Sequence, residues 1–176
     1  DDPDGCDRHP DVYSVCELIG VIEPARSLIL DAIVYGKHIV TANKELHAQY
    51  GNEIFAAAHA KGVMVAFEGA VAGGVPIIKA LREGLTANRI EWIAGIINGT
   101  TNFILSTMRE TGASFETALK EAQARGYAEA DPTFDVNGID SAHQPAIMSA
   151  IAFSVPMQFD NAYADGIPNL ARRDPA

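Results

Sequence analysis

The sequence has few cysteines and histidines, and this scarcity limits the chemistry that the chain can support. Its two cysteines, Cys6 and Cys16, follow no signal-like start. A reduced cytoplasmic setting is therefore favoured over secretion, and a disulfide between the two is not favoured. The five histidines never occur as His-x-x-x-His or together with Cys-x-x-Cys. The sequence thus offers almost no support for a zinc site.

The chain also lacks any cluster of positive charge and any long apolar run. Its 13 Lys and Arg residues stand against 23 Asp and Glu residues, which gives a net charge of −10. This balance argues against nucleic acid or an anionic membrane surface as a partner. With 48% hydrophobic residues in a length of 176, the chain is expected to be a soluble globular protein with one domain or two small lobes.

A third feature that is missing is the glycine-rich turn of a nucleotide-binding domain. Such a domain ordinarily opens with a strand, a Gly-x-Gly-x-x-Gly turn and a helix whose N-terminus receives the pyrophosphate. Nothing of that kind precedes Val12. The chain is therefore expected to begin partway through a nucleotide-binding domain, with the first part of that domain absent.

The first half of the chain alternates short β-branched runs with segments of helical periodicity. The pattern predicts strands at 12–19, 38–41 and 63–67, and helices at 23–35, 44–61 and 75–82. This alternation indicates βαβ units and a mostly parallel sheet. The predicted fold class is α/β, with the second half of a doubly wound, Rossmann-like nucleotide domain followed by an α/β lobe.

The second half of the chain predicts a strand and then mostly helices. The strand is expected at 89–97, and the helices at 101–110, 114–125 and about 138–154. Ser114 is a reasonable N-cap for the second of these helices. The tail after Phe159 has little periodicity and two prolines, so it is either a loose end or a piece whose partner strands are absent.

The segment from Thr41 to Lys44, Thr-Ala-Asn-Lys, joins a predicted strand to a predicted helix. Ligands bind at the carboxyl ends of the strands in open α/β sheets. Asn43 could simply cap the helix, with Lys44 a solvated residue of the first turn. A lysine in that turn is opposed by the helix dipole, which favours a special reason for its presence.

Two further segments admit a structural and a functional interpretation. The glycine-rich bend from Glu68 to Pro76 suits a tight turn, with Pro76 at the first helical position. A bend of this kind also turns carbonyl groups inward, as a hard monovalent cation would require. The segment from Asn98 to Asn102, Asn-Gly-Thr-Thr-Asn, could supply a helix cap through Thr100 or Thr101, or could face a cleft.

The stretch from Gly126 to Gln144 gathers acids in a Pro-containing loop and on the helix that follows. Loop acids are usually solvated. Asp140 and Gln144 are four residues apart, so they share a helix face and could hydrogen-bond each other. Acids that converge with few compensating bases could instead hold a ligand with an ammonium group.

Together these segments resemble homoserine dehydrogenases over 1 to about 170. The resemblance rests on Thr-Ala-Asn-Lys, the glycine-rich bend, Asn-Gly-Thr, and Ala-x-x-x-Gly-Tyr followed by Asp-Pro-x-x-Asp-Val-x-Gly-x-Asp. In the family a lysine comes four residues after the last aspartate, whereas here Gln144 stands in its place and Pro145 follows. The implied reaction is reversible hydride transfer between NADP, or NAD, and L-aspartate 4-semialdehyde to give L-homoserine, a step of threonine, methionine and isoleucine biosynthesis.

The resemblance also implies roles for individual residues. Those implied in catalysis are Lys44, Asp140 and Gln144. Those implied in substrate binding are Glu129, Asp135 and Asp140. Those implied in cofactor binding are Ile19, Gly20, Lys44 and Gly126. A structural sodium ion is implied on backbone oxygens of Glu68, Val71, Gly73 and Val75.

The resemblance further implies a domain division and an assembly. Residues 1–62 would be the C-terminal part of the NAD(P)-binding domain, 63–160 the catalytic and substrate domain, and 161–176 an irregular tail. The implied partners are the small-molecule substrate and a second copy of the chain in a homodimer.

The departure at Gln144 and Pro145 puts the activity of the chain in question. An amide can donate a hydrogen bond but cannot release a proton. Pro145 is expected to kink the helix or shift its start past Ala142, which would displace Gln144 relative to Asp140. The chain is therefore predicted to be an impaired homoserine dehydrogenase or, alternatively, a non-catalytic substrate-lobe fragment that acts as a dimerisation module.

Overall fold

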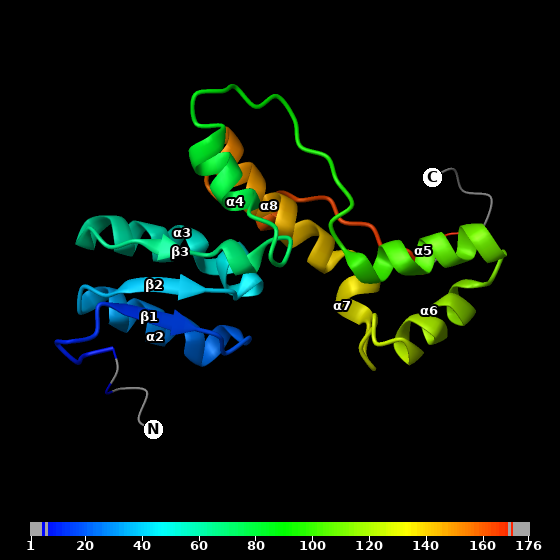
Figure 1. Ribbon diagram of the computed structural model, residues 1–176, viewed down its shortest axis with the longest axis horizontal. Coiled ribbons are helices and arrows are strands. Elements are labelled where there is room, and N and C mark those ends of the chain that lie inside the picture. Colours follow the sequence, from blue (N-terminus) through cyan, green and yellow to red (C-terminus); the bar gives the residue numbers. More distant parts are fainter. Residues whose placement is uncertain (1–4, 6, 169, 171–176) are drawn as a thin grey trace. The chain divides into compact units, whose positions relative to one another are not determined.

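The computed structural model divides the chain into two compact units (Figure 1). It describes residues 5, 7–168 and 170, so Cys6 lies outside the described part. Unit 1 comprises residues 1–93 and 143–161, and unit 2 comprises residues 94–142 and 162–176. One helix, α8 (Ile139–Phe153), contributes residues to both units.

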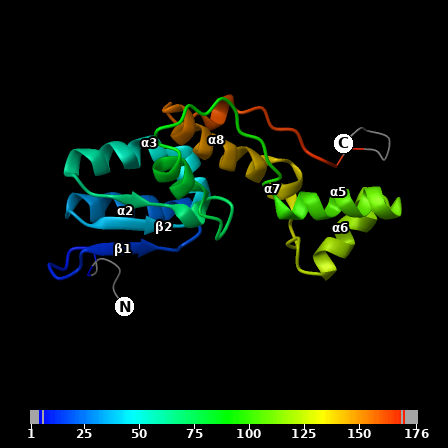
Figure 2. The same cartoon turned by 45° about the horizontal axis from the view of Figure 1, so that its top comes forward.

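Unit 1 is built on a parallel sheet of three strands in the order β1–β2–β3, of which β1 and β2 are labelled in Figure 2. The strands are β1 (Ser14–Glu17), β2 (His38–Thr41) and β3 (Val65–Ala66). In the register, Glu17 pairs with Thr41, and Ile39 pairs with Val65. The predicted α/β class and parallel sheet are confirmed, although β1 and β3 are shorter than the apolar runs that predicted them.

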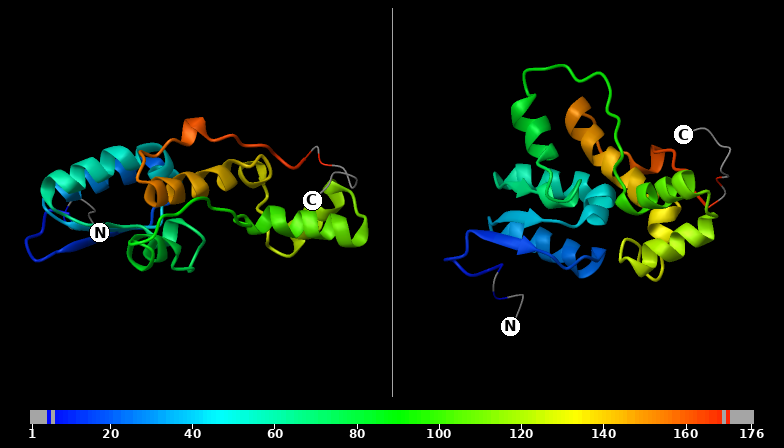
Figure 3. Two further views of the ribbon diagram at one scale, coloured as in Figure 1. Left: turned by 90° about the horizontal axis from the view of Figure 1, so that it is seen from above. Right: turned by 45° about the vertical axis from the view of Figure 1, so that its right-hand side comes forward.

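Helices α2 (Ile22–Val34) and α3 (Lys44–Lys61) connect the strands, contact each other and lie on the same side of the sheet (Figure 3, left). Helix α2 turns one face inward because its buried residues recur at helical spacing. These residues are Ala25, Ile29, Ala32 and Ile33. Helix α3 begins at the N-cap Asn43 and ends at Gly62. Both helices therefore follow the periodicity of the sequence closely.

After β3 the chain forms the glycine-rich bend and a short helical segment. The elements are η1 (Glu68–Ala70), α4 (Ile77–Lys79) and a single π-type turn, η2 (Ala80–Gly84). The helix expected at 75–82 is thus present, but Pro76 precedes its first residue.

The strand predicted at 89–97 is wrong. The described residues form no strand there, and the segment is an extended chain without a ladder partner. Its apolar side chains include Trp92 and Ile96, which are 74% and 82% exposed. An extended segment becomes a strand only through pairing with a neighbour, and that pairing is invisible in the local pattern.

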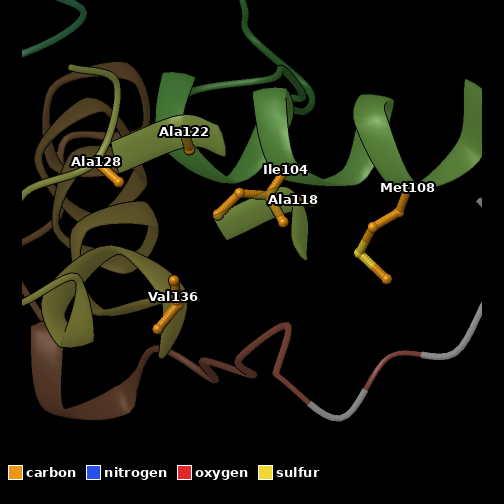
Figure 4. Close-up of a cluster of buried hydrophobic side chains, with 6 residues drawn as sticks. All are labelled: Ile104, Met108, Ala118, Ala122, Ala128 and Val136. Atoms are coloured by element: carbon orange, nitrogen blue, oxygen red, sulfur yellow. The ribbon is translucent and has the colours of Figure 1, made fainter. Parts of the chain in front are cut away.

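Unit 2 contains helices α5 (Gly99–Thr111), α6 (Phe115–Ala124) and the short α7 (Thr133–Val136). The first two were predicted and the third was not. Ser114 caps α6 as expected, since its hydroxyl accepts a hydrogen bond from Thr117 N. The core of this unit is a small apolar cluster (Figure 4). Its members are Ile104, Met108, Ala118, Ala122, Ala128 and Val136.

The tail is tied to unit 2 in its described part. Ile167 packs against the apolar cluster, and its N–H donates to Val136 O at 2.9 Å. Gly138 lies directly beneath the tail, with a φ of 79°, and a β-carbon there would come within 2.7 Å of Asp165 O. Only glycine combines this backbone conformation with so close an approach.

Helix α8 begins at Ile139 and continues through Pro145 to Phe153. The expected shift of its start past Ala142 is therefore wrong, and the N–H of Ala142 bonds to Gly138 O in the first turn. Burial of Ala142, Ile147 and Met148 accounts for this outcome, because packing offsets the ~3 kcal/mol that an interior proline costs. Among the residues that the structure describes, no helix is long and apolar enough to cross a membrane.

Candidate functional site

The carboxyl end of the sheet in unit 1 carries a buried acid. Glu17 ends β1, is 4% exposed, and lies beside Thr41 at the end of β2. Its Oε2 accepts a hydrogen bond from Thr41 Oγ1 at 2.6 Å, and its Oε1 accepts one from Ile19 N at 2.6 Å. The two strands are therefore joined by side chains at the edge where open α/β sheets bind their ligands.

Asn43 connects this edge to the start of α3. Its Oδ1 accepts from Leu46 N at 3.1 Å, so the interpretation of Asn43 as a helix cap is confirmed. Its backbone N–H donates to Thr41 Oγ1 at 3.0 Å, and its side-chain Nδ2 donates to Val21 O at 2.9 Å. Lys44 follows as the half-buried first residue of the helix.

Ile19 and Gly20, the two residues implied in cofactor contact, form the exposed turn after β1. Gly20 has a φ of 78°, a conformation that side chains disfavour. The turn is held at both of its ends. Ile19 N is bound to Glu17, and Val21 O is bound to Asn43.

His47 lies one turn into α3 and is fully buried. Its Nδ1 lies 3.1 Å from Asn43 O, and its ring stacks on Phe67 with centroids 4.9 Å apart. Burial lowers the pKa of His47, while the contact with Asn43 O and the charge of Glu17 act in the opposite direction. The neutral ring therefore donates from Nδ1 to Asn43 O.

Sequence reasoning did not single out Glu17 or His47. The sequence did carry a signal for Glu17, because this acid stands within an otherwise apolar predicted strand. Acids in such strands are seldom buried unless they are paired. His47 gave no comparable signal, since a histidine on a helix is equally compatible with an exposed position.

The glycine-rich bend is held by two side chains. The carboxylate of Glu68 accepts from Ile78 N at 2.8 Å and from Lys79 N at 2.9 Å, so it caps the start of α4. Gln144, which is 4% exposed, accepts at Oε1 from Ala72 N at 2.9 Å. Ala72 has a φ of 55°, which is uncommon for a residue with a side chain. The residue at the position of the family's lysine thus binds the backbone of this bend.

The bend also contains the carbonyl groups implied in sodium binding. The carbonyl of Glu68 accepts a hydrogen bond from Val71 N at 3.4 Å, and that of Val75 accepts one from Ile77 N at 2.8 Å. Each carbonyl oxygen has two lone pairs and keeps capacity for a cation. The sodium site stays a prediction.

In unit 2, one asparagine brings two acids together. Asn98 Nδ2 donates to Asp135 Oδ1 at 2.8 Å and to Asp140 Oδ2 at 2.9 Å. Its Oδ1 accepts from Thr101 N at 2.8 Å, so Asn98 itself caps α5, rather than Thr100 or Thr101. Asn98 and Asp140 are both buried, and Asp135 is half-buried. We call this arrangement the acid clamp.

The other two acids of residues 126–144 are exposed. Glu129 is exposed, and its backbone carbonyl accepts from Gln123 Nε2 at 3.0 Å. Asp131 is also exposed, and hydrogen bonds from the Thr133 hydroxyl and N–H hold the pKa of Asp131 below its usual range. Gly126, with a φ of 76°, lies exposed just after α6. Of the three acids implied in substrate binding, the acid clamp brings together Asp135 and Asp140.

A separate cavity of about 520 Å³ lies in unit 1. His38, which begins β2, and Met64, which precedes β3, line it together with Phe55 and Phe67. Neither Glu17 nor Asn43 is among its lining residues.

These features define a class of protein: half of a doubly wound nucleotide-binding domain joined to a lobe that presents paired carboxylates. Family models refine this class. The model for the homoserine dehydrogenase NAD-binding domain matches residues 5–68, and the model for homoserine dehydrogenase matches residues 76–176.

Individual relatives agree with the family models. Homoserine dehydrogenase of Pseudomonas aeruginosa is 63% identical over 166 residues, which are 94% of this chain and 38% of that protein. The enzyme of Neisseria gonorrhoeae is 63% identical over 93% of this chain and 38% of its own length. The chain therefore spans about 38% of the length of these curated relatives.

Solved structures agree as well. The crystal structure of a homoserine dehydrogenase from Thiobacillus denitrificans matches 98% of this chain and 40% of that chain, with a TM-score of 0.95 and 68% identity. A mutant hyperthermophilic archaeal homoserine dehydrogenase in complex with NADPH matches 89% of this chain and 48% of its own, with a TM-score of 0.79 and 29% identity. The chain belongs to the homoserine dehydrogenase family.

Proposed function

We propose that this chain carries part of the nucleotide site and the substrate lobe of a homoserine dehydrogenase. The reaction would be the reversible, NAD(P)H-dependent reduction of L-aspartate 4-semialdehyde to L-homoserine. The observation that carries this proposal is the acid clamp, in which Asn98 holds Asp135 and Asp140 within hydrogen-bond distance of one amide group. Paired carboxylates of this kind suit a substrate that carries an ammonium group.

The proposed roles follow from the charge that develops during the reaction. The bound nicotinamide would supply a hydride, and negative charge would build on the aldehyde oxygen. A nearby acid must then donate a proton, and nearby donors must stabilise the oxyanion. We assign proton donation to Lys44, contact with the reacting oxygen to Asp140, and binding of the substrate amine and hydroxyl to Glu129 and Asp135.

Position 144 has a different proposed role from the family's lysine. Gln144 has no titrating group, and its Oε1 is engaged by Ala72 N. It can support the reaction through hydrogen bonding but cannot act as a general acid. General acid–base help typically contributes about 10²–10⁴-fold, so with proton donation left to Lys44 alone we expect the chemical step to be slower than in the family by up to about that factor.

The proposed cofactor is NADP or NAD, with contacts from Ile19, Gly20, Lys44 and Gly126. The NAD-binding family model over residues 5–68 supports a nicotinamide nucleotide without deciding between the two. We place the functional division at 1–62, 63–160 and 161–176. A structural sodium ion on the bend, a homodimer and a cytoplasmic location belong to the same proposal.

An assay of aldehyde reduction tests this function. The chain is joined to a complete nucleotide-binding segment of the Pseudomonas aeruginosa relative, and NADPH consumption is followed with L-aspartate 4-semialdehyde. The variant with Gln144→Lys and Pro145→Leu is compared with the unsubstituted fusion and with Gln49→Lys, which adds a lysine on an exposed position of α3. The proposal requires that the double variant reduce the aldehyde, and an inactive double variant refutes it.

The second candidate function is a non-catalytic fragment that dimerises through the substrate lobe. The observation that favours it is the engagement of Gln144 with the bend, which gives position 144 a structural task in place of a chemical one. Fluorescence titration with NADPH separates the two functions, because binding at about micromolar concentration by the chain alone contradicts the fragment. Sedimentation velocity then shows whether the chain forms a dimer.

A further inference from the structure

We propose that Glu17 is a positioning residue that couples the turn after β1 to the start of α3. The inference rests on the proposed function, because it takes that turn as a cofactor contact and Lys44 as the proton donor. In this view Glu17 touches neither substrate nor cofactor. It sets the geometry of two segments that do.

An unbroken series of hydrogen bonds joins the two segments. Ile19 N and Thr41 Oγ1 both donate to the carboxylate of Glu17, at 2.6 Å each. The hydroxyl of Thr41 accepts in turn from Asn43 N at 3.0 Å. The side-chain Nδ2 of Asn43 in turn donates to Val21 O, at the end of the turn after β1, at 2.9 Å. The series thus forms a closed circuit around residues 17–21 and 41–43.

The chemistry of the circuit requires an acceptor on both oxygens of residue 17. Because a carboxylate can only accept, the N–H of Ile19 and the hydroxyl of Thr41 both donate to it. A glutamine would present an NH₂ group to one of these donors and leave it without an acceptor. Glu17 is 4% exposed, which leaves little access for water as a substitute.

The circuit reaches Lys44 through the helix cap. Asn43 caps α3 because its Oδ1 accepts a hydrogen bond from Leu46 N, and its carbonyl oxygen also accepts one from Nδ1 of His47. Lys44 is the next residue along the chain, so the placement of Asn43 determines where its side chain departs from the backbone. A shift of Glu17 would therefore alter both the cofactor turn and the start of the helix.

Hydrogen exchange of backbone amides in the isotopically labelled chain tests this coupling. In Glu17→Gln we expect the amides of Ile19 and Asn43 to exchange at least about tenfold faster. The amides of Gly62 and Val63, which are bonded at the other end of α3, serve as internal controls and should keep their rates. Unchanged exchange at Asn43 overturns the proposal, and so does an equal rise at all four amides, which would indicate general destabilisation.

Thr41 supplies matched variants that do not alter the acid. Thr41→Val removes the hydroxyl and should raise exchange at Asn43, whereas Thr41→Ser keeps the hydroxyl and should leave it unchanged. The double variant Glu17→Gln, Thr41→Val should exchange no faster at Asn43 than the faster single variant, because both changes break the same circuit. Additive effects overturn the coupling. If Glu17→Gln does not fold, the Thr41 pair decides the question.

Kinetics of the fused chain provide a functional readout. Displacement of the turn should raise the KM for NADPH by about tenfold in Glu17→Gln and in Thr41→Val, with normal values in Thr41→Ser. An unchanged KM for NADPH in both variants overturns the positioning of the turn, whatever happens to kcat, because kcat falls when Lys44 is displaced and also when fewer molecules are folded. If the unsubstituted fusion reduces no aldehyde, the proposed function fails, while the exchange experiment still tests the circuit.

Discussion

Helices α3 and α5 begin in the same way but serve their units differently. Each has an asparagine at the N-cap, and each asparagine uses Oδ1 to accept the N–H three residues later. The amide nitrogens differ in their partners. Asn43 donates to one neutral carbonyl, that of Val21, whereas Asn98 donates to the carboxylates of Asp135 and Asp140.

The difference shows that a cap residue can carry a second task whose strength depends on its partner. A hydrogen bond to a charged group contributes more than one to a neutral carbonyl, and two carboxylates near one point also repel each other. The amide of Asn98 therefore offsets the repulsion between the two carboxylates to which it donates. The amide of Asn43 adds one hydrogen bond to a neutral carbonyl, in a turn that Glu17 also binds.

The largest effect is expected for Asn98→Asp, which keeps the cap but replaces the amide donor with a third carboxylate. Two hydrogen bonds to charged acceptors are lost and repulsion is added, so the free energy of unfolding should fall by about 3 kcal/mol or more. Urea unfolding followed by circular dichroism measures this change. Asn98→Ser keeps a capping oxygen and adds no charge, so its free energy of unfolding should fall by less than that of Asn98→Asp. Equal losses in the two variants would mean that repulsion at the acid clamp is unimportant.

A third buried amide sharpens the comparison, because Gln144 acts as an acceptor. Gln144→Lys removes the acceptor of Ala72 N and should lower the free energy of unfolding by about 1–3 kcal/mol. Faster hydrogen exchange at Ala72 should accompany this loss. Gln144→Glu keeps an acceptor and should protect the Ala72 amide. Normal protection in the lysine variant would show that the contact contributes little.

A smaller effect is expected for Asn43→Asp. The cap is retained and a carboxylate at a helix N-terminus is favourable, which partly offsets the loss of the bond to Val21 O and the repulsion between that carbonyl and the new carboxylate. The free energy of unfolding should fall by about 1 kcal/mol, less than for Asn98→Asp. The same urea titration gives the ranking of the two variants. A reversed ranking would contradict the interpretation that the charge of the partner determines the strength of the amide contact.

The smallest effect concerns pH and His47, which lies behind the Asn43 cap. Because burial lowers its pKa in the folded chain, the unfolded chain binds a proton first as the pH falls. The contribution of neutral His47 to the stability of the folded chain is fully present above a pH of about 6.5, the ordinary histidine pKa. This contribution is lost as the pH falls through the lowered pKa that His47 has in the folded chain. Unfolding titrations over this range should show a weaker pH dependence in His47→Leu than in the parent chain. Gln49→Leu, which changes an exposed position of the same helix without removing a titrating group, should behave like the parent.

Local pattern was sufficient for much of the fold. The periodicity of α2 and α3, the cap at Asn43 and the cap at Ser114 were all predictable, because each depends on neighbours within one or two turns. The strand expected at 89–97 failed because pairing depends on distant residues. The extent of α8 agrees with the helix predicted at about 138–154, and only the expected shift of its start past Ala142 was wrong, since burial of Ile147 and Met148 outweighs the local cost of Pro145.

The candidate site was predictable in its residue types but not in its contacts. The acids at 135 and 140 were recognisable from the motif, yet nothing in the sequence indicated that the cap of α5 would hold both. The link between Gln144 and Ala72 spans 72 positions and lay beyond any local pattern. Long-range contacts of this kind depend on the packing of the whole unit.

The crossing of the tail over the start of α8 has a consequence for mutational scans. Gly138 and Gly166 approach opposite stretches of main chain so closely that a methyl group on either would lie within 2.7 Å of Asp165 O or 2.9 Å of Val136 O. A substitution at either glycine should therefore lower the yield of folded protein, although neither glycine has a functional group. A screen for the proposed activity would lose signal at both positions, and only a parallel measure of folded protein would separate packing residues from residues that take part in the chemistry.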